Sequence, residues 1–397
     1  MKRLAGVSIL VLCTVLLLST LVACGKSAET TTAAVESTAS SSSSTTTSVS
    51  STESSTVTSA SSTTASGGLT YTGPAMELTV NLCSSEEQMV IYRDALQRIS
   101  DRTGGKVTFV IHYSGSLLAP TETLDGLASG LCDISDVTLT NFPDRFVYTQ
   151  QVTSYPFLGF TSLAMASDIM NDAIFENKLM MDEFKAANVT PVFFTGVWGT
   201  SLVLKKEVEV STPDTIKGLK LITDNPILSK FLADHGATPV NQPPTEYFGS
   251  MSNNLVDGIM QALYVVDIFG GLQVAKRVYM FENSFSTGVR CICVNGDTWA
   301  KFDDTLKQIF MDEWQGEQFW NTAVNWWATQ DQVHLDNAAK WNIPVNYIKG
   351  DTMQAWKDAA KPYGDATLKE LYNKGYTEVY NVLDFWNKKI SSYSGKY

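Results

Sequence analysis

The chain has 397 residues, and 44% of them are hydrophobic, which is enough apolar material for two domains with separate cores. Its formal net charge of −12 argues against nucleic acid or an anionic membrane surface as a partner, because both are negatively charged. The sequence contains no GxSxG, HExxH, P-loop or GxGxxG motif and only three histidines, so we expect no enzyme and no cofactor. A hydrolase built on a carboxylate pair is the enzymatic alternative.

The N-terminus is typical of an exported protein. A basic start, Met1-Lys2-Arg3, precedes an apolar run that ends in Leu21-Val22-Ala23-Cys24. This ending is similar to the processing site of bacterial lipoproteins, so we predict a signal peptide over 1–23 and lipidation of Cys24. An uncleaved transmembrane anchor and an ordinary secretory signal are the alternatives.

Residues 24–75 are mostly Ser and Thr and have no apolar periodicity. Such a segment cannot bury enough surface to offset the entropy of ordering, so we predict a flexible tether. A flexible chain of this length spans on the order of 40 Å, which would hold a folded receptor away from the membrane.

The folded part is predicted to begin with alternating α and β elements. We expect a strand over 76–83, a helix that starts at Ser84 and runs to about Ser100, and a second strand over 107–113. A third strand opens at 130–134. The pattern then predicts one helix over 163–187 and a strand over 189–194, before a crossing segment at 196–201.

Residues 211–258 predict a strand–helix–strand–helix unit. Lys217–Thr223 reads as a strand, and a helix from Pro226 to His235 is stopped by Gly236. A second strand opens at Pro239, and a second helix follows Thr245. The ends of parallel strands in such a unit face a ligand cleft.

The C-terminal third is predicted to be mainly helical. A return strand over 288–294 precedes a single long helix over 299–341 and a pair of amphipathic helices over 350–397. The core candidates of that pair are Trp356, Leu371, Tyr380 and Trp386. Cysteines 83, 132, 291 and 293 are expected to be buried thiols, with a Cys83–Cys132 disulfide as the alternative for two of them.

Four motifs in register connect this sequence with a known family. They are TPDxxKGLK from Thr212, GATPV from Gly236, EY at Glu246 and VDG from Val256. Their order and spacing resemble the second lobe of the extracytoplasmic solute-binding proteins of tripartite ATP-independent periplasmic (TRAP) transporters, and the resemblance covers about 76–390. It implies a secreted monomer that binds a small organic acid and hands it to TRAP membrane subunits.

The resemblance also implies an α/β fold with two lobes of the periplasmic-binding-protein type. Each lobe would have a mixed or parallel sheet with helices on both faces, and a long helix would span both lobes. We expect lobe 1 over 76–199 and 288–327, and lobe 2 over 200–287 and 328–397.

The ligand site implied by the family is altered in this sequence. Ile222 and Ser201 stand where the family has arginines that grip the ligand carboxylate, and Gln261 stands for a usual asparagine. An isoleucine would make the cleft floor apolar, so the ligand group there should be neutral, or Arg290 should supply the charge. The predicted ligand-binding residues are Ser84, Gln88, Glu122, Trp198, Ser201, Ile222, Thr223, Asn225, Gln261, Tyr264 and Arg290.

Several of these assignments have an alternative interpretation. Glu122 is equally well explained as an exposed acid in a first helical turn, and Arg290 as a surface residue at a strand end. A transport receptor explains the signal, tether and two α/β units together. An orphan solute sensor or surface-binding lipoprotein is the second interpretation.

Overall fold

The structure is a computed structural model that describes residues 69–197 and 199–396. The predicted signal peptide, the lipidation site Cys24, most of the tether and the predicted ligand contact Trp198 lie outside these residues.

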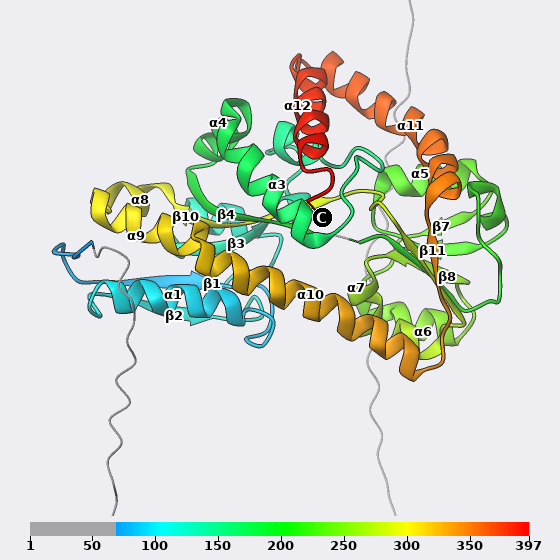
Figure 1. Ribbon diagram of the computed structural model, residues 1–397, viewed down its shortest axis with the longest axis horizontal. Coiled ribbons are helices and arrows are strands. Elements are labelled where there is room, and N and C mark those ends of the chain that lie inside the picture. The colour runs from blue at the N-terminus through cyan, green and yellow to red at the C-terminus, as the bar shows by residue number, and fades with distance from the viewer. Residues whose placement is uncertain (1–68, 198, 397) are drawn as a thin grey trace, which may run out of the picture. The chain divides into compact units, whose positions relative to one another are not determined.

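The described residues contain two mixed β-sheets (Figure 1). In the first, parallel pairing of β1 with β2 and β3 is followed by antiparallel pairing of β10 with β3 and β4. Its order is β2-β1-β3-β10-β4, with β1 (Met76–Asn81), β2 (Val107–His112), β3 (Ile134–Thr138), β4 (Val189–Val197) and β10 (Gly288–Asn295). The predicted return strand is therefore confirmed as β10.

Helices cover both faces of the first sheet. On one face Val80 and Ile292 pack against α1 (Val90–Arg102), α9 (Asp304–Gln315) and α10 (Glu317–Lys340). On the other face Val289 and Phe194 pack against α3 (Leu163–Glu176), α4 (Lys178–Ala186) and α12 (Val379–Ser392). The short α2 (Thr123–Ala128) contacts β3 and β10, and α8 (Gly296–Lys301) contacts β10 and β4.

The second sheet has the order β11-β9-β5-β8-β6-β7. Its strands are β5 (Ser201–Leu204), β6 (Lys220–Ile222), β7 (Thr238–Val240), β8 (Gly258–Gln261), β9 (Arg277–Phe281) and β11 (Val345–Ile348). One face packs on α5 (Pro226–Asp234) and α11 (Gly350–Asn373), and the other on α6 (Tyr247–Ser252) and α7 (Leu263–Ile268). β6 and β7 pair in parallel around α5, so the predicted βαβ unit is confirmed.

The single helix predicted over 299–341 is wrong, because the chain forms α8, α9 and α10 there. Asp303 caps α9 by accepting a hydrogen bond from the Leu306 N–H at 2.8 Å, which requires an extended backbone at that point. Gly316 separates α9 from α10 with ψ of 155°, and a Cβ there would lie 2.2 Å from the carbonyl oxygen of Asp312. A cap and a glycine therefore interrupt the apolar periodicity.

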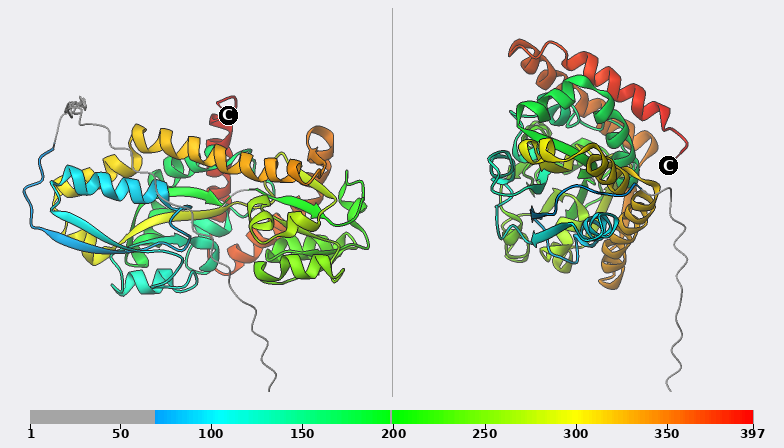
Figure 2. Two further views of the ribbon diagram at one scale, coloured as in Figure 1. Left: turned by 90° about the horizontal axis from the view of Figure 1, so that it is seen from below. Right: turned by 90° about the vertical axis from the view of Figure 1, so that its left-hand side faces the viewer.

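α10 still connects the two halves of the fold. It packs against α1 and α3 of the first sheet and against α7 of the second, and Figure 2 shows it lying alongside both sheets. The C-terminal helices also join both cores. In α11, Trp356 packs with the second sheet, whereas Leu371 and, in α12, Trp386 pack with the first. The lobe boundary drawn at residue 328 stays a prediction.

Smaller departures from the expected elements have local causes. The predicted helix over 163–187 is two helices, because Asn177 caps α4 through the N–H groups of Leu179 and Met180. α1 begins at Val90 rather than at Ser84. The expected helix pair at the C-terminus is confirmed, but Tyr380 is exposed and is not a core residue.

The four cysteines in the described part of the chain are free thiols. The alternative of a Cys83–Cys132 disulfide is therefore not realised. Cys132, Cys291 and Cys293 are buried as expected, whereas Cys83 is only partly buried, so the expectation is wrong for Cys83. None of the described helices combines the length and the apolar character needed to cross a membrane.

Candidate ligand-binding cleft

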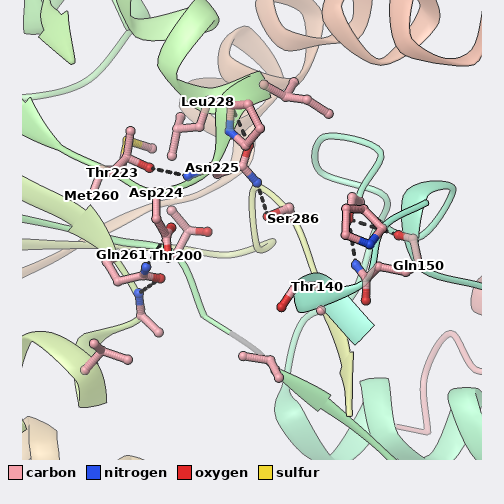
Figure 3. A pocket seen from close by; sticks show the side chains of 18 of the residues that line it. Thr140, Gln150, Thr200, Thr223, Asp224, Asn225, Leu228, Met260, Gln261 and Ser286 are labelled. Atoms are coloured by element: carbon pink, nitrogen blue, oxygen red, sulfur yellow. Dashed lines mark hydrogen bonds between the residues drawn. The ribbon is translucent and has the colours of Figure 1, made fainter. Parts of the chain in front are cut away.

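A cavity of about 920 Å³ lies between the two sheets and is lined by residues from both (Figure 3). The first sheet contributes through two short turns, η1 (Leu139–Asn141) and the π-helical η2 (Val147–Gln151). The second contributes through the residues that follow β6 and β8, two neighbouring parallel strands. Because the carboxyl ends of parallel strands meet at one edge of a sheet, these residues lie together at the cleft.

The turn after β6 is held by its own side chains and by the return strand. Asn225 caps α5, since its Oδ1 accepts a hydrogen bond from the Leu228 N–H at 2.9 Å, and Pro226 occupies the first helical position. The Asn225 Nδ2 donates to Ser286 Oγ at 2.9 Å, and Thr223 Oγ1 accepts from the Asn225 N–H at 3.3 Å. This network fixes the polar wall of the second lobe.

A second pair of side chains extends that wall. Gln261 Nε2 donates to Asp224 Oδ1 at 2.9 Å, and Gln261 Oε1 accepts from the Ala262 N–H at 2.9 Å, so the amide has one orientation. Burial and the negative charge of Asp224 raise the pKa of the neighbouring Tyr247 to about 12. Tyr247 therefore stays protonated beneath the wall at neutral pH.

The opposite wall is built around Gln150. Its Oε1 accepts a hydrogen bond from the Val289 N–H at 2.7 Å, and its Nε2 donates to Ser154 Oγ at 2.8 Å. The half-buried carboxylate of Glu183 orders the same turn by accepting from the N–H groups of Tyr148 and Thr149 at 2.8 and 2.9 Å. Burial raises the pKa of Glu183 despite these hydrogen bonds. Gln150 is thus rigidly presented to the cleft.

Arg290 lies close to the cleft but is paired inside the first lobe. Its Nη2 donates to Asp136 Oδ2, and its Nε is buried without a hydrogen-bond partner among the described residues. Burial alone would lower the pKa of Arg290, but the Asp136 carboxylate outweighs it, so the pKa is raised. Burial raises the pKa of Tyr264, which lines the cavity, and the charge of Arg290 opposes that rise, so the two side chains are electrostatic neighbours.

The family model of the bacterial extracellular solute-binding proteins of family 7 matches residues 92–371. The chain belongs to this family. A TRAP periplasmic solute-binding protein from Desulfovibrio salexigens, solved as an open complex with a symmetry mate's C-terminus in its ligand site, is 25% identical, with a TM-score of 0.71. The match covers 81% of this chain and 98% of that one.

Other solved family members share the fold at lower identity. A marine metagenome TRAP solute-binding protein specific for aromatic acid ligands, in complex with metahydroxyphenylacetate, is 15% identical, covers 80% and 99% of the two chains, and has a TM-score of 0.69. One from Chromohalobacter salexigens with bound D-glucuronate is 17% identical, covers 79% and 99%, and has a TM-score of 0.66. The two-lobed α/β fold is therefore established, and the family consists of solute-binding proteins rather than enzymes.

Within this family 7 protein, the cavity brings together a part of the predicted set. Thr223, Asn225, Gln261 and Tyr264 all line it. Ser201 and Ile222 are fully buried, and the Ile222 side chain packs in the second-sheet core with Tyr247 and Ile259. Ile222 therefore lies behind the cleft wall rather than on its floor.

The remaining predicted residues lie elsewhere in the first lobe. Glu122 is the exposed residue before α2, and its Oε2 accepts a hydrogen bond from the Ala119 N–H at 3.3 Å. Ser84 and Gln88 lie between β1 and α1. Among the described residues these three and Arg290 do not line the cavity, and their ligand-binding roles stay predictions.

Sequence reasoning missed the polar residues that the first lobe contributes. Thr140, Asn141, Gln150, Gln151 and Ser154 line the cavity, as does Ser286 just before β10. They belong to short turns that carry no family motif and no periodicity. The available sequence signal was the group of uncharged polar residues around Val152, namely Thr149, Gln150, Gln151, Thr153 and Ser154.

Proposed function

We propose that this chain is the extracytoplasmic receptor of a TRAP-type transporter, which captures a small organic solute between its lobes and delivers it to the membrane subunits. The observation that carries the proposal is the cavity of about 920 Å³ lined by both lobes. Ligand cavities of this size accommodate solutes of several tens of heavy atoms or fewer. The solutes of the named family members, aromatic acids and a uronate, make an organic acid the first class to test.

Within the cavity we propose Thr223, Asn225, Gln261 and Tyr264 as ligand contacts of the second lobe. Their amide, hydroxyl and phenol groups can donate and accept hydrogen bonds without carrying charge. Gln150 and Asn141 face the cavity from the first lobe and complete a polar site. Trp198, in the crossing segment, remains a proposed stacking partner.

A thermal-shift screen over organic acids, aromatic acids, amino acids and nucleosides tests this function. A solute at 100 times its dissociation constant stabilises the folded state by about 2.7 kcal/mol, which gives a clear rise in melting temperature. Thr140→Trp places a large ring in the cavity from an exposed position on η1 and should strongly reduce the shift. Thr108→Trp, at an exposed position on β2 outside the cavity, is the matched control and should keep it.

Delivery to a transporter requires a second experiment. Vesicles that contain the TRAP membrane subunits should accumulate the solute only when this receptor is present. A variant with strongly reduced solute binding, such as Thr140→Trp, should give correspondingly little uptake. Solute binding without any uptake would favour the surface-sensor alternative.

We also propose that the receptor is anchored by lipid at Cys24, outside the described residues. The apolar run that ends in Leu21-Val22-Ala23-Cys24 supports this proposal. Cys24→Ala should release the protein from membranes or leave an unprocessed precursor. Unchanged membrane association with the N-terminal apolar segment intact would show a transmembrane anchor instead.

A further inference from the structure

We propose that Asp224 makes the second-lobe wall of the cleft a binding position for an ammonium group, so that the transported solute carries an amine. This inference rests on the proposed solute-binding function and adds a chemical class to it. An amino acid satisfies both this class and the organic-acid class, because it carries both groups.

The charge of the cleft is the first observation. Among the lining residues that the structure describes, Asp224 is the only one with a formal charge. The other polar groups are hydroxyls and amides, including Thr140, Gln150 and Asn225. A solute that fills the cavity removes water from the Asp224 carboxylate, which is costly unless the solute supplies an opposite charge or several donors.

The position of the carboxylate is the second observation. Asp224 is the second residue after β6 and precedes the α5 cap, and it is exposed to the cavity. Gln261 Nε2 donates a hydrogen bond to Asp224 Oδ1 at 2.9 Å, while Asp224 Oδ2 has no hydrogen-bond partner among the described residues (Figure 3). A fixed carboxylate with one free oxygen is a suitable acceptor for a charged donor.

An aromatic ring completes the position. Tyr264 on α7 lines the same cavity and is 39% exposed. Partial burial raises the pKa of its phenol, the charge of Arg290 opposes that rise, and the charge of Asp224 adds to it. Tyr264 and Asp224 therefore interact electrostatically across the cavity that both line. An ammonium group is stabilised by a carboxylate on one side and by the face of an aromatic ring on another.

No protein cation described near this position competes for Asp224. Arg290 is the cation whose charge acts on the pKa of Tyr264, and its guanidinium is already paired with the buried Asp136. The Asp224 carboxylate therefore remains to be neutralised by the solute.

Matched solute pairs that differ by an amino group test the inference by calorimetry. We choose aspartate and succinate, glutamate and glutarate, phenylalanine and 3-phenylpropionate, and putrescine with butane-1,4-diol. A charge-assisted hydrogen bond corresponds to a roughly 10- to 100-fold difference in affinity. The amine member of at least one pair should bind more tightly than its partner by that factor.

The variant Asp224→Asn should weaken the amine member by the same factor. It should leave a neutral partner unchanged and should not weaken an anionic partner, because it removes a like charge. Asp214→Asn removes an exposed carboxylate on the short turn η3 (Pro213–Ile216), outside the cavity, and it should change neither affinity. Two results would overturn this inference and leave the receptor function standing: equal affinity for the amine and its partner in every pair that binds, or an amine affinity that Asp224→Asn does not change. Tightest binding by a neutral polyol would also overturn it, and failure of every solute class to bind would overturn both.

Discussion

The guanidinium of Arg290 on β10 and the carboxylate of Asp136 on β3 form an ion pair inside the first lobe, with side chains 21% and 1% exposed. Asp136 Oδ1 also accepts a hydrogen bond from the Cys83 N–H at 2.8 Å. One carboxylate thus joins the return strand to the loop that follows β1. This loop precedes α1, so the pair connects three elements at the cleft end of the sheet.

Arg290→Met should destabilise the protein by about 3–5 kcal/mol, because it leaves the Asp136 carboxylate buried without a counter-charge. The double variant Arg290→Met, Asp136→Leu should recover most of this loss. Urea unfolding measures both. Arg93→Met removes an exposed arginine paired with Glu86 and should cost less than about 1 kcal/mol. Equal losses in Arg290→Met and Arg93→Met would contradict the assignment of a buried pair.

Ile222→Arg should destabilise the second lobe rather than create an anion site. The Ile222 side chain is fully buried among Tyr247, Ile259 and other apolar groups, so a guanidinium there would lose its hydration without a partner. A loss on the order of 4 kcal/mol in the free energy of unfolding is expected. A stably folded Ile222→Arg variant that gains carboxylate binding would instead place residue 222 on the cleft surface.

Gln150→Leu should reduce both stability and solute affinity. It removes the acceptor of the buried Val289 N–H, which costs about 1–3 kcal/mol, and it removes a polar group from the cavity. Gln150→Glu keeps an acceptor at the same distance and should retain more of the stability. Thermal unfolding and calorimetric titration separate the two effects. Identical behaviour of the two variants would show that the Val289 hydrogen bond is unimportant.

Asp257, in the VDG motif, should make stability depend on pH. Partial burial alone would raise the pKa of Asp257. However, Lys206 Nζ lies 2.6 Å from its Oδ1, and the Lys220 N–H donates to its Oδ2 at 2.8 Å. These interactions outweigh burial, so the pKa of Asp257 is lowered. A carboxyl whose pKa is lowered by folding stabilises the folded state at pH values above its ordinary pKa of about 3.9. This stabilisation is lost as the pH falls through the pKa of the folded state. Asp257→Asn should therefore be less stable than the wild type by about 1 kcal/mol at neutral pH and equally stable in acid.

Local sequence signals predicted most of the fold, because they are encoded by neighbouring residues. Pro226 and Gly236 delimit α5, and the parallel strands on either side of it follow from the same short stretch. The break at Gly316 was not predictable from periodicity, since the apolar positions continue through it. β9 and β11 were also missed, because their pairing joins residues far apart in the chain.

The candidate site was predictable only on the side of the family motifs. Asn225 and Gln261 follow strands that the motifs locate, whereas Gln150 reaches the cleft through η2, which the distant Glu183 orders. Tertiary contacts of that kind leave no pattern in a single sequence. The family resemblance also implied a clamp position for Ile222, but burial of its side chain depends on the packing of the strand, which the motif does not encode.

Plain C4-dicarboxylates should bind weakly to the mature protein. Ser201 and Ile222, for which the resemblance implies arginines in the family, are buried, and none of the described lining residues is a cation. A dicarboxylate would also meet the like charge of Asp224, so no dissociation constant below about 1 mM is expected. Calorimetric titration of succinate, malate and fumarate measures this directly, with Asp224→Asn as the variant in which repulsion is relieved. Micromolar affinity of the wild type for any of the three acids would show that a cation, such as a released Arg290, enters the cleft when solute binds.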